Sequence, residues 1–350
     1  MSKHVYVIAE AGVNHNGSVD RALEMIDRAV AAGADAVKFQ TFRSEQVISR
    51  HAVKAEYQQR TTGSDESQLD MVRALELDAD SHARLAAHCR QRGIQFLSTP
   101  FDVPSVGLLQ TLGVPLLKVP SGEITNPLLL RAVAATGLPL IVSTGMSTLG
   151  EVEAALALLA AAWLGRADAF ASDDGQRLLH ERVTLLHCTT EYPAPYDEVN
   201  LRAMATMQSA FGLRVGYSDH TPGTTIAVAA VALGAVVIEK HFTLDRTLPG
   251  PDHIASLEPD ELTALVAAIR ATEQALGSAV KRPSPSEAKN LIVARKSLVA
   301  ARSIRRGEPF TTDNLAAKRP GSGISAMRYD EWLGRLADRD YEVDDLVGVE

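Results

Sequence analysis

Short runs of β-branched and apolar residues alternate with longer amphipathic segments from residue 4 to about residue 277. This alternation constrains the fold more than any other feature, because it is the pattern of repeated strand–helix units with parallel strands. The predicted strands end at Glu10, Gln40, Thr99, Ser121, Thr144, Cys188, Ser218 and His241. The predicted helices include 18–33, 81–93, 149–163, 224–234 and 259–277, several of which begin with Ser or Thr and end at Gly. Eight such units predict a (β/α)8 barrel of the TIM type.

The composition changes at Lys281–Ser286, which is rich in Pro and Ser and predicts a domain boundary. We expect the barrel at 1–280, a linker at 281–292 and a small α+β domain at 293–350. Within the small domain, Ser297–Ala300 and Leu315–Lys318 are predicted as short strands. The charged segment 167–181 is predicted as a surface excursion before the sixth strand of the barrel.

Composition and charge argue against several classes of protein. A net charge of −8 is unlike the basic surface of nucleic-acid-binding domains. The apolar run 154–164 is shorter than the roughly 20 residues of a membrane span, and the N-terminal residues do not resemble a secretory signal. Cys89 and Cys188 lie in apolar-periodic segments and are expected to be reduced core thiols. These features predict a cytoplasmic protein with neither a membrane nor a nucleic-acid partner.

Polar residues follow every predicted strand, and in a barrel all eight carboxyl ends open onto one face. Lys38 and Lys118 interrupt apolar runs there, so each ammonium group needs an anionic partner. That partner is either a phosphate or carboxylate ligand, or a structural Glu or Asp. Hydroxyl donors that suit such a ligand follow nearby strands at Ser121, Ser143 and Ser218.

Two histidines, His220 and His241, follow neighbouring strands and could direct their imidazoles at one point. Neutral imidazole binds Mn, Fe, Co or Zn in preference to Mg, so a divalent metal site is predicted. His187 ends an adjacent strand and is a third candidate ligand.

Two carboxylates, Glu10 and Glu239, lie at the ends of the first and eighth strands, which become neighbours when the barrel closes. One could orient or deprotonate water while the other binds sugar hydroxyls. Structural salt bridges to Lys38 or Lys240 are the alternative role for these two side chains.

Several motifs, in order along the chain, resemble the sialic acid synthase family, which includes N-acetylneuraminate and legionaminate synthases. They lie at Ile8–Gly17, Lys118–Glu123, Gly216–Thr221, Glu239–Thr243 and Pro249–His253. The tail is similar to the antifreeze-like (SAF) domain of those enzymes, especially at Lys318–Ile324. The resemblance covers essentially the whole chain.

This resemblance implies an enzyme of carbohydrate biosynthesis that condenses phosphoenolpyruvate with N-acetylmannosamine and water, giving N-acetylneuraminic acid and phosphate by C–O cleavage. The alternative is a legionaminic acid synthase that uses 2,4-diacetamido-2,4,6-trideoxymannose. It also implies a domain-swapped homodimer. A Schiff-base aldolase on the same barrel and a non-catalytic sugar-binding protein are the other hypotheses.

The same resemblance implies roles for individual residues. Glu10 is implied as the catalytic carboxylate, and His220 and His241 as ligands of a divalent metal, Mn²⁺ first, with Mg²⁺ or Co²⁺ as alternatives. The implied phosphoenolpyruvate-binding residues are Lys38, Thr99, Lys118, Ser121, Ser143, Thr190 and Ser218. The implied sugar-binding residues are Gln40, Tyr192, Glu239, Asp252 and, from the partner subunit of the dimer, a second copy of Arg319. The chain departs from some members at Thr190, where they carry a phosphate-binding Asn, and at Arg295, where they carry a Phe.

Overall fold

The computed structural model describes residues 4–63 and 66–348, and the chain divides into two compact units, Met1–Gly277 and Ser278–Glu350. The outer ends of the two predicted domains, 1–3 and 349–350, therefore lie outside the described residues. Among the residues described, no helix is long and apolar enough to cross a membrane.

The first unit is built on eight parallel strands: β1 (Tyr6–Gly12), β2 (Ala36–Thr41), β3 (Gln95–Pro100), β4 (Leu117–Val119), β5 (Leu140–Ser143), β6 (Val183–His187), β7 (Arg214–Asp219) and β8 (Val237–His241). Hydrogen bonds connect them in the order β3-β2-β1-β8-β7-β6-β5-β4. The two end strands of this order, β3 and β4, also lie against each other, so the sheet curls into a near-closed barrel. The predicted TIM-type barrel is confirmed.

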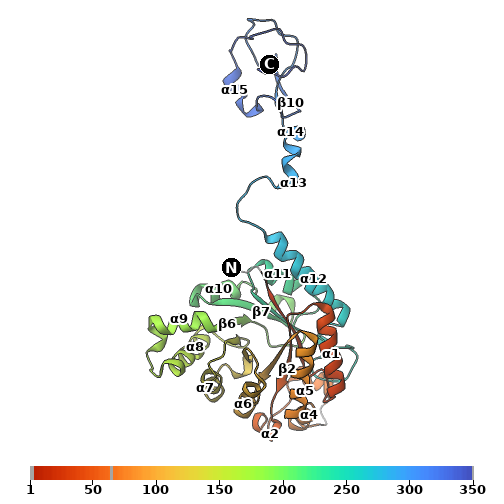
Figure 1. Cartoon of the computed structure of the whole chain (residues 1–350), viewed down its shortest axis with the longest axis vertical. Helices are drawn as coiled ribbons and strands as arrows, with labels where there is room; N and C mark the ends of the chain where they lie inside the picture. The colour runs from red at the N-terminus through yellow and green to blue at the C-terminus, as the bar shows by residue number, and fades with distance from the viewer. Residues whose placement is uncertain (1–3, 64–65, 349–350) are drawn as a thin grey trace. The chain divides into compact units, whose positions relative to one another are not determined.

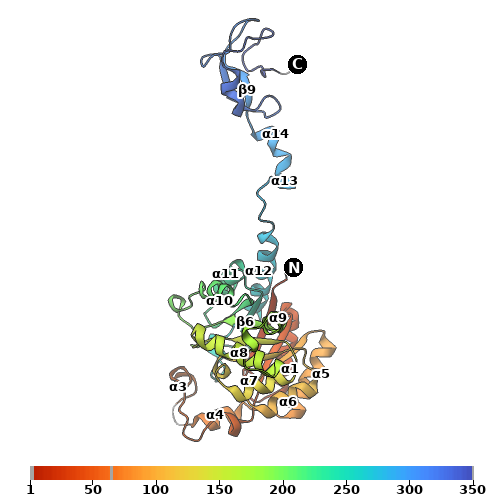
Figure 2. The same ribbon diagram turned by 90° about the vertical axis from the view of Figure 1, so that its left-hand side faces the viewer.

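Helices cover the outside of the sheet, as Figures 1 and 2 show. They are α1 (Val19–Ala32), α5 (Ala79–Arg92), α6 (Val103–Leu112), α7 (Pro127–Ala135), α8 (Leu149–Leu164), α10 (Ala203–Phe211), α11 (Thr225–Ala232) and α12 (Pro259–Leu276). Short 3₁₀ helices follow three of the strands: η1 (Ser121–Glu123), η3 (Tyr196–Glu198) and η4 (His253–Ala255). All five predicted helices are present.

Local sequence explains where the helices begin and end. Helix α1 starts at Ser18, whose side chain accepts a hydrogen bond from the Arg21 N–H, and stops at Gly33 in a left-handed conformation (φ 79°). Side-chain N-caps of the same kind start other barrel helices at Asp78, Asp102, Asn126 and Thr148.

A layer of apolar side chains lies inside the barrel. Six strands contribute one residue each: Ile8, Ala36, Leu97, Ile141, Leu186 and Val237. Side chains two positions apart on a strand point to the same side of a sheet. The residues two positions further along, including Glu10, Lys38, Thr99, Ser143 and Glu239, therefore also point into the barrel, at its carboxyl end.

Segment 167–181, which we predicted as a surface excursion, contains η2 (Ala169–Ala171) and a helix of its own, α9 (Asp173–Arg182). Ser172 caps this helix, and its residues Leu178 and Leu179 form the buried face. Its charges lie on the exposed side, where Arg177 pairs with Asp174 and Glu181. The polar composition of the segment therefore reflects the outer face of a helix.

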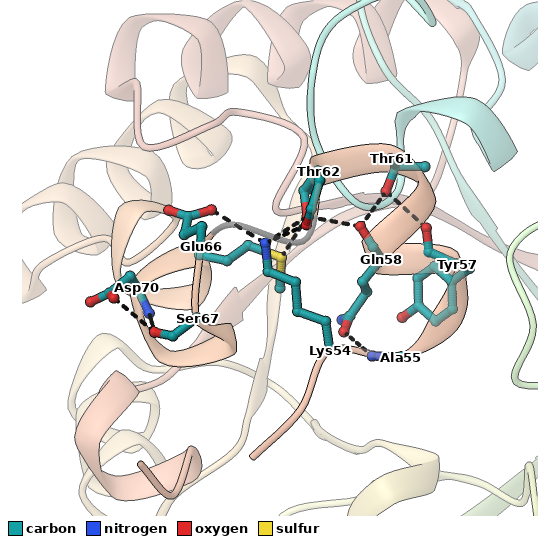
Figure 3. Close-up of polar contacts among 11 residues, drawn as sticks. Lys54, Ala55, Tyr57, Gln58, Thr61, Thr62, Glu66, Ser67 and Asp70 are labelled. Atoms are coloured by element: carbon teal, nitrogen blue, oxygen red, sulfur yellow. Dashed lines mark hydrogen bonds and ion pairs between the residues drawn. The ribbon is translucent and has the colours of Figure 1, made fainter. Parts of the chain in front are cut away.

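A long insertion separates β2 from α5 and contains α2 (Ser44–Val47), α3 (Glu56–Thr62) and α4 (Gln68–Ala74). Figure 3 shows how a lysine organises it: the Lys54 ammonium group donates to Thr62 Oγ1 at 3.0 Å and lies 3.5 Å from the Glu66 carboxylate. It also donates to the Gly63 carbonyl at 3.1 Å. A buried cation thus connects the start of α3 to its end and to the residues before α4.

The second unit contains α13 (Pro285–Ala288), α14 (Asn290–Ala294), β9 (Ser297–Ala300), β10 (Leu315–Lys318), η5 (Ala326–Arg328) and α15 (Tyr329–Trp332). The two strands pair antiparallel and have the bounds predicted from the sequence. This unit has its own apolar core around Phe310 and Tyr341. Residues 281–292, which we predicted as a linker, include α13 and the beginning of α14.

Candidate active site

A cavity of about 310 Å³ lies at the carboxyl ends of the barrel strands. Except for His187, the candidate third metal ligand, the site residues predicted in the first unit line it: Glu10, Lys38, Gln40, Thr99, Lys118, Ser121, Ser143, Thr190, Tyr192, Ser218, His220, Glu239, His241 and Asp252. Because these residues come from all eight strands or the loops after them, closure of the sheet is what brings them to one place.

Two lysines and two glutamates form a buried ion-pair network in this cavity. Lys38 Nζ lies 2.6 Å from Glu10 Oε2 and 3.6 Å from Glu239 Oε2, and Lys118 Nζ lies 3.2 Å from Glu239 Oε1. Lys38 also donates to Thr99 Oγ1 at 2.7 Å. The salt bridges that we considered as the structural alternative are therefore present for Lys38, Lys118 and both glutamates. They line the cavity, so a ligand that enters it meets all four charges.

Burial and neighbouring charges separate the pKa values of the two carboxyl groups. Burial raises the pKa of Glu10 to about 7, although Lys38 opposes the shift. Burial also disfavours the charge on Glu239, but Lys118 and Lys38 outweigh it and hold the Glu239 pKa well below its usual range. Glu239 is therefore ionised throughout the physiological range, whereas Glu10 can gain or lose a proton near neutral pH.

The two lysines also differ. Burial disfavours the charge on Lys38, but Glu10 and Glu239 outweigh it, so the pKa of Lys38 is raised. Burial dominates at Lys118, where the pKa is lowered. Lys240 points away from the cavity and pairs with Asp219 at 2.9 Å, so it does not take part in the network.

The predicted metal ligands lie close together and are neutral. Their ring centroids are 5.5 Å apart, and burial lowers the pKa of His220 to about 4 and that of His241 well below its usual value. His220 Nδ1 lies 2.5 Å from the Thr189 carbonyl. Because a carbonyl only accepts, Nδ1 carries the proton and Nε2 keeps its lone pair.

The donor set of these histidines fits a divalent cation. His241 Nδ1 is buried without a hydrogen-bond partner among residues 4–63 and 66–348. In the same described ranges, no group of three or more His, Cys, Asp or Glu side chains has a metal-binding arrangement. A cation at the pair would therefore need further ligands from substrate or water. His187 is not part of this group, because its Nε2 donates to the Val199 carbonyl at 2.6 Å.

Hydroxyl groups around Gly145 form another part of the cavity lining. Ser143 Oγ and Thr190 Oγ1 are buried and, within the part of the chain that the structure describes, have no hydrogen-bond partner. Ser121 Oγ accepts from the Gly145 N–H at 3.0 Å. A Cβ atom at Gly145 would lie 2.3 Å from Thr190 Oγ1 and 2.8 Å from Ser121 Oγ, so any larger residue would displace these hydroxyls. Buried unpaired donors beside two ammonium groups are suited to bind an anion.

An aromatic side chain covers the histidines. The Tyr192 ring lies 4.2 Å from the His220 ring and 5.1 Å from Tyr57 of α3, between centroids. Asp252 Oδ2 lies 3.8 Å from His241 Nδ1, and burial raises the pKa of Asp252 to about 6. These side chains place an aromatic face and a carboxyl group next to the predicted metal ligands.

Sequence reasoning missed one part of the lining, which comes mainly from the insertion after β2: Phe42, Val47, Ile48, Tyr57, Gln58, Gln68, Met71, Val72 and Leu75. Val13 and Phe101, which follow β1 and β3, complete it. A signal was available, because loops between strands and helices in such folds are usually about two to six residues long and longer ones are often functional.

Two residues connected with the sugar by resemblance lie in the second unit. Arg319 is exposed, and its Nε donates to the Ala294 carbonyl at 3.1 Å. Arg295 is also exposed. Their contacts with a sugar remain predictions.

Comparisons with known proteins agree along the chain. Residues 25–281 match the NeuB family and residues 295–347 match the SAF domain. The chain is 52% identical to an N,N'-diacetyllegionaminic acid synthase of Campylobacter jejuni, over 99% of both chains. It is 44% identical to an enzyme of the same name from Legionella pneumophila, over 94% of this chain and 89% of that one. The crystal structure of an N-acetylneuraminic acid synthetase from Leptospira borgpetersenii, in complex with citrate, is 35% identical, with a TM-score of 0.68 over 82% of this chain and 90% of that one.

Proposed function

Because this chain belongs to the NeuB family and carries an SAF domain, we propose that it is an N,N'-diacetyllegionaminic acid synthase. The proposed reaction condenses phosphoenolpyruvate with 2,4-diacetamido-2,4,6-trideoxymannose and water, and releases phosphate. The sequence alone favoured N-acetylmannosamine as the acceptor. The higher identity to the two legionaminic acid synthases favours the alternative acceptor instead.

The observation that carries this proposal is the combination of groups that line one cavity. The lining contains two ammonium groups, buried hydroxyls without a partner among the described residues, two neutral imidazoles and a carboxyl group with a pKa of about 7. Lys38, Lys118 and the hydroxyls of Ser143 and Thr190 would hold the phosphate and carboxylate of phosphoenolpyruvate. An anion bound there would replace part of the contact that each lysine makes with a glutamate.

A divalent cation at His220 and His241, with Mn²⁺ favoured over Mg²⁺ or Co²⁺, would supply Lewis-acid polarisation of the sugar aldehyde. Gln40, Tyr192, Glu239 and Asp252 would orient the open-chain sugar next to it. Of these, Glu239 is held in position by the Ser218 hydroxyl, which donates to Glu239 Oε1 at 2.9 Å.

Glu10 would act on water. In the proposed reaction C3 of phosphoenolpyruvate bonds to the aldehyde carbon, and positive charge develops at C2. Water adds at C2 and gives a proton to Glu10, whose pKa of about 7 suits a base at neutral pH. The aldehyde oxygen, which became negative when C3 bonded to its carbon, takes the proton from Glu10 and becomes a hydroxyl group. The bond between C2 and the phosphate oxygen then breaks, phosphate leaves with the electron pair and the remaining proton of the added water, and C2 becomes the ketone carbon. The lysines stabilise the phosphate as it leaves.

The test is a panel of acceptor sugars, with phosphate release as the rate and mass spectrometry for the product. We expect the fastest release, and a nine-carbon diacetamido sugar acid, with 2,4-diacetamido-2,4,6-trideoxymannose. The Glu10→Gln variant should lose at least about 100-fold in kcat, as for removal of a general base. Glu123→Gln, a carboxylate in η1 that pairs with Asn126, is the matched control. No phosphate release with any sugar in the panel would contradict the proposal.

A Schiff-base aldolase is the second candidate, and one observation favours it. The lowered pKa of Lys118 increases the fraction of its side chain that is in the neutral, nucleophilic amine form. Borohydride treatment in the presence of pyruvate separates the two reactions. The condensation proposed here predicts no stable adduct on Lys118, and a mass increase at that lysine would support the aldolase.

We propose further that the enzyme acts in the cytoplasm as a domain-swapped homodimer, in which each barrel receives Arg319 of the partner subunit. The exposure of Arg319 and the free, buried state of Cys89 and Cys188 support this arrangement and location. A mixture of Glu10→Gln and Arg319→Ala dimers should regain activity as the subunits exchange, because one barrel of each mixed dimer then has both intact residues. Failure to regain activity, when mass spectrometry shows mixed dimers, would contradict the swap.

A further inference from the structure

We propose that apolar residues following β1, β2 and β3 form a specificity wall, which binds the methyl groups at the end of the acceptor sugar remote from its aldehyde. This inference rests on the condensation proposed above and concerns which acceptor the site prefers. The specificity wall consists of Val13, Phe42, Val47, Val72, Leu75 and Phe101.

The mouth of the barrel is chemically asymmetric. Immediately after β1, β2 and β3, which are neighbours in the sheet, come Val13, Phe42 and Phe101. The strands on the other side of the barrel end in or near hydroxyl, thiol and imidazole side chains. A ligand in this cavity therefore meets polar groups around the ring of strands and, after β1, β2 and β3, apolar side chains as well.

The six residues of the wall form an apolar cluster of their own. Val13, Phe42 and Leu75 are buried, and Val47, Val72 and Phe101 pack on them, apart from the main core between the sheet and its helices. The rings of Phe42 and Phe101 meet edge to face, 6.2 Å apart between centroids. All six residues also line the cavity. A cluster that only anchored the insertion to the barrel would not need to line the cavity with every member.

The wall is built by the insertion as well as by the barrel. Val47 belongs to α2, Val72 to α4, and Leu75 is the residue at which α4 ends. Gln58 of α3 and Gln68 of α4 line the same cavity. Side-chain amides are suitable hydrogen-bond partners for acetamido groups, so the insertion offers both kinds of contact that a diacetamido sugar needs.

The two candidate acceptors differ where this wall would touch them. N-acetylmannosamine carries hydroxyl groups at C4 and C6, whereas the trideoxy sugar carries an acetamido group at C4 and a methyl group at C6. Against the wall, methyl groups lose contact with water favourably, whereas hydroxyl groups lose hydrogen bonds to water. One methyl group in an apolar pocket typically changes kcat/KM by about 10- to 200-fold. The wall thus favours the deoxygenated acceptor.

The experiment compares the two acceptors in wild type and in Val72→Thr, which replaces a methyl group by a hydroxyl of similar size. We expect kcat/KM for the trideoxy sugar to fall about tenfold and the preference over N-acetylmannosamine to fall by a similar factor. The KM for phosphoenolpyruvate should stay unchanged. Val47→Thr, on the other helix of the wall, should shift the preference in the same direction. The matched control is Val228→Thr in α11, a partly buried valine that packs on the main core and should leave the preference unchanged.

The outcomes separate this inference from the proposed function. If both threonine variants fold, as circular dichroism would report, and slow the two acceptors equally, the specificity wall is wrong and the condensation stands. The same holds if wild type shows no preference between the acceptors. If wild type releases phosphate with neither acceptor, the proposed function itself fails.

Discussion

At the scale of single residues, strand register decides which charges meet. Glu10 of β1 lies opposite Lys38 of β2 on one side and His241 of β8 on the other, and Ser218 of β7 lies opposite Glu239 of β8. A shift of one residue in any of these pairings would turn the side chains of one strand away from the interior. The register therefore keeps Glu10 in the interior, where burial raises its pKa to about 7 against the opposing effect of Lys38.

Gly145→Ala should raise the KM for phosphoenolpyruvate at least about tenfold, because the added Cβ would displace the hydroxyls of Thr190 and Ser121 that lie within 2.8 Å of it. Steady-state kinetics with each substrate varied in turn would measure this, and the KM for the sugar should change little. Gly107→Ala in α6 is the control, since a Cβ there meets nothing within 4 Å and alanine favours a helix. Equal effects of the two variants would refute the role of Gly145.

His241→Ala should weaken binding of Mn²⁺ and abolish phosphate release while the fold stays intact, because one of two neutral imidazoles is lost. Titration calorimetry with Mn²⁺ alone measures the first effect without relying on activity. His187→Ala is the matched control, because this histidine bonds to Val199 and does not line the same cavity. Near-normal turnover of His241→Ala would show that His241 is not a required metal ligand.

At the scale of elements, the insertion after β2 turns an open barrel mouth into a lined cavity. Helix α3 carries Tyr57 against Tyr192, which in turn packs on His220. The helix itself is short, and Lys54 connects its first residues with Thr62 and Gly63 at its end. A seven-residue helix gains little stability from its own backbone, so these contacts hold its shape.

Lys54→Met should loosen α3 and raise the KM for the sugar several-fold, since the methionine keeps most of the apolar stem but donates no hydrogen bonds. Hydrogen exchange should quicken at the amides of 55–63. Arg73→Met is the control: Arg73 pairs with Glu45 and Asp70 on the exposed surface, where an ion pair contributes little to stability. Unchanged exchange in Lys54→Met would show that α3 does not depend on this lysine.

At the scale of the whole molecule, closure of the barrel joins the beginning of the first unit to its end. The loop after β1 carries His15, and the loop after β8 carries His253, and both side chains are buried. Thr243 Oγ1 lies 2.7 Å from His253 Nδ1, and the Gly17 N–H donates to His15 Nδ1 at 3.1 Å. Burial lowers the pKa of each histidine to about 4, and nearby cationic groups add to the shift at both.

These histidines should make the fold sensitive to acid. In the unfolded chain a histidine has a pKa of about 6.5, so between pH 6.5 and 4 the unfolded state binds more protons than the folded state. The free energy of unfolding should therefore fall as the pH falls through this window, by at most about 1.4 kcal/mol per pH unit for each histidine. Below pH 4 these two groups should cause no further loss.

The measurement is the free energy of unfolding of the first unit in urea, at a series of pH values between 4.5 and 7.5, and the slope is the change of this free energy with pH. His15→Asn, which keeps an acceptor for the Gly17 N–H, should have a smaller slope than wild type. His51→Asn, a change at an exposed histidine, should retain the slope of wild type. A His15→Asn slope equal to that of wild type would contradict the role of this buried imidazole.

The sequence by itself was enough to predict the eight-stranded barrel, the two strands of the second unit and the polar strand ends that line the cavity. These features follow from local rules: period-two and helical patterns, capping residues, and the common face onto which parallel strands open. Motifs such as Ile8–Gly17 also pointed to the family, because they are read directly from the chain.

The tertiary structure decided how these residues act on one another. Lys38 contacts both Glu10 and Glu239, which are far apart in the chain, and it does so because the barrel closes between β1 and β8. The specificity wall likewise depends on α2 and α4 folding back over the mouth of the barrel. Pairing distances, burial and the resulting pKa values depend on contacts between distant segments, and no local pattern in the sequence encodes them.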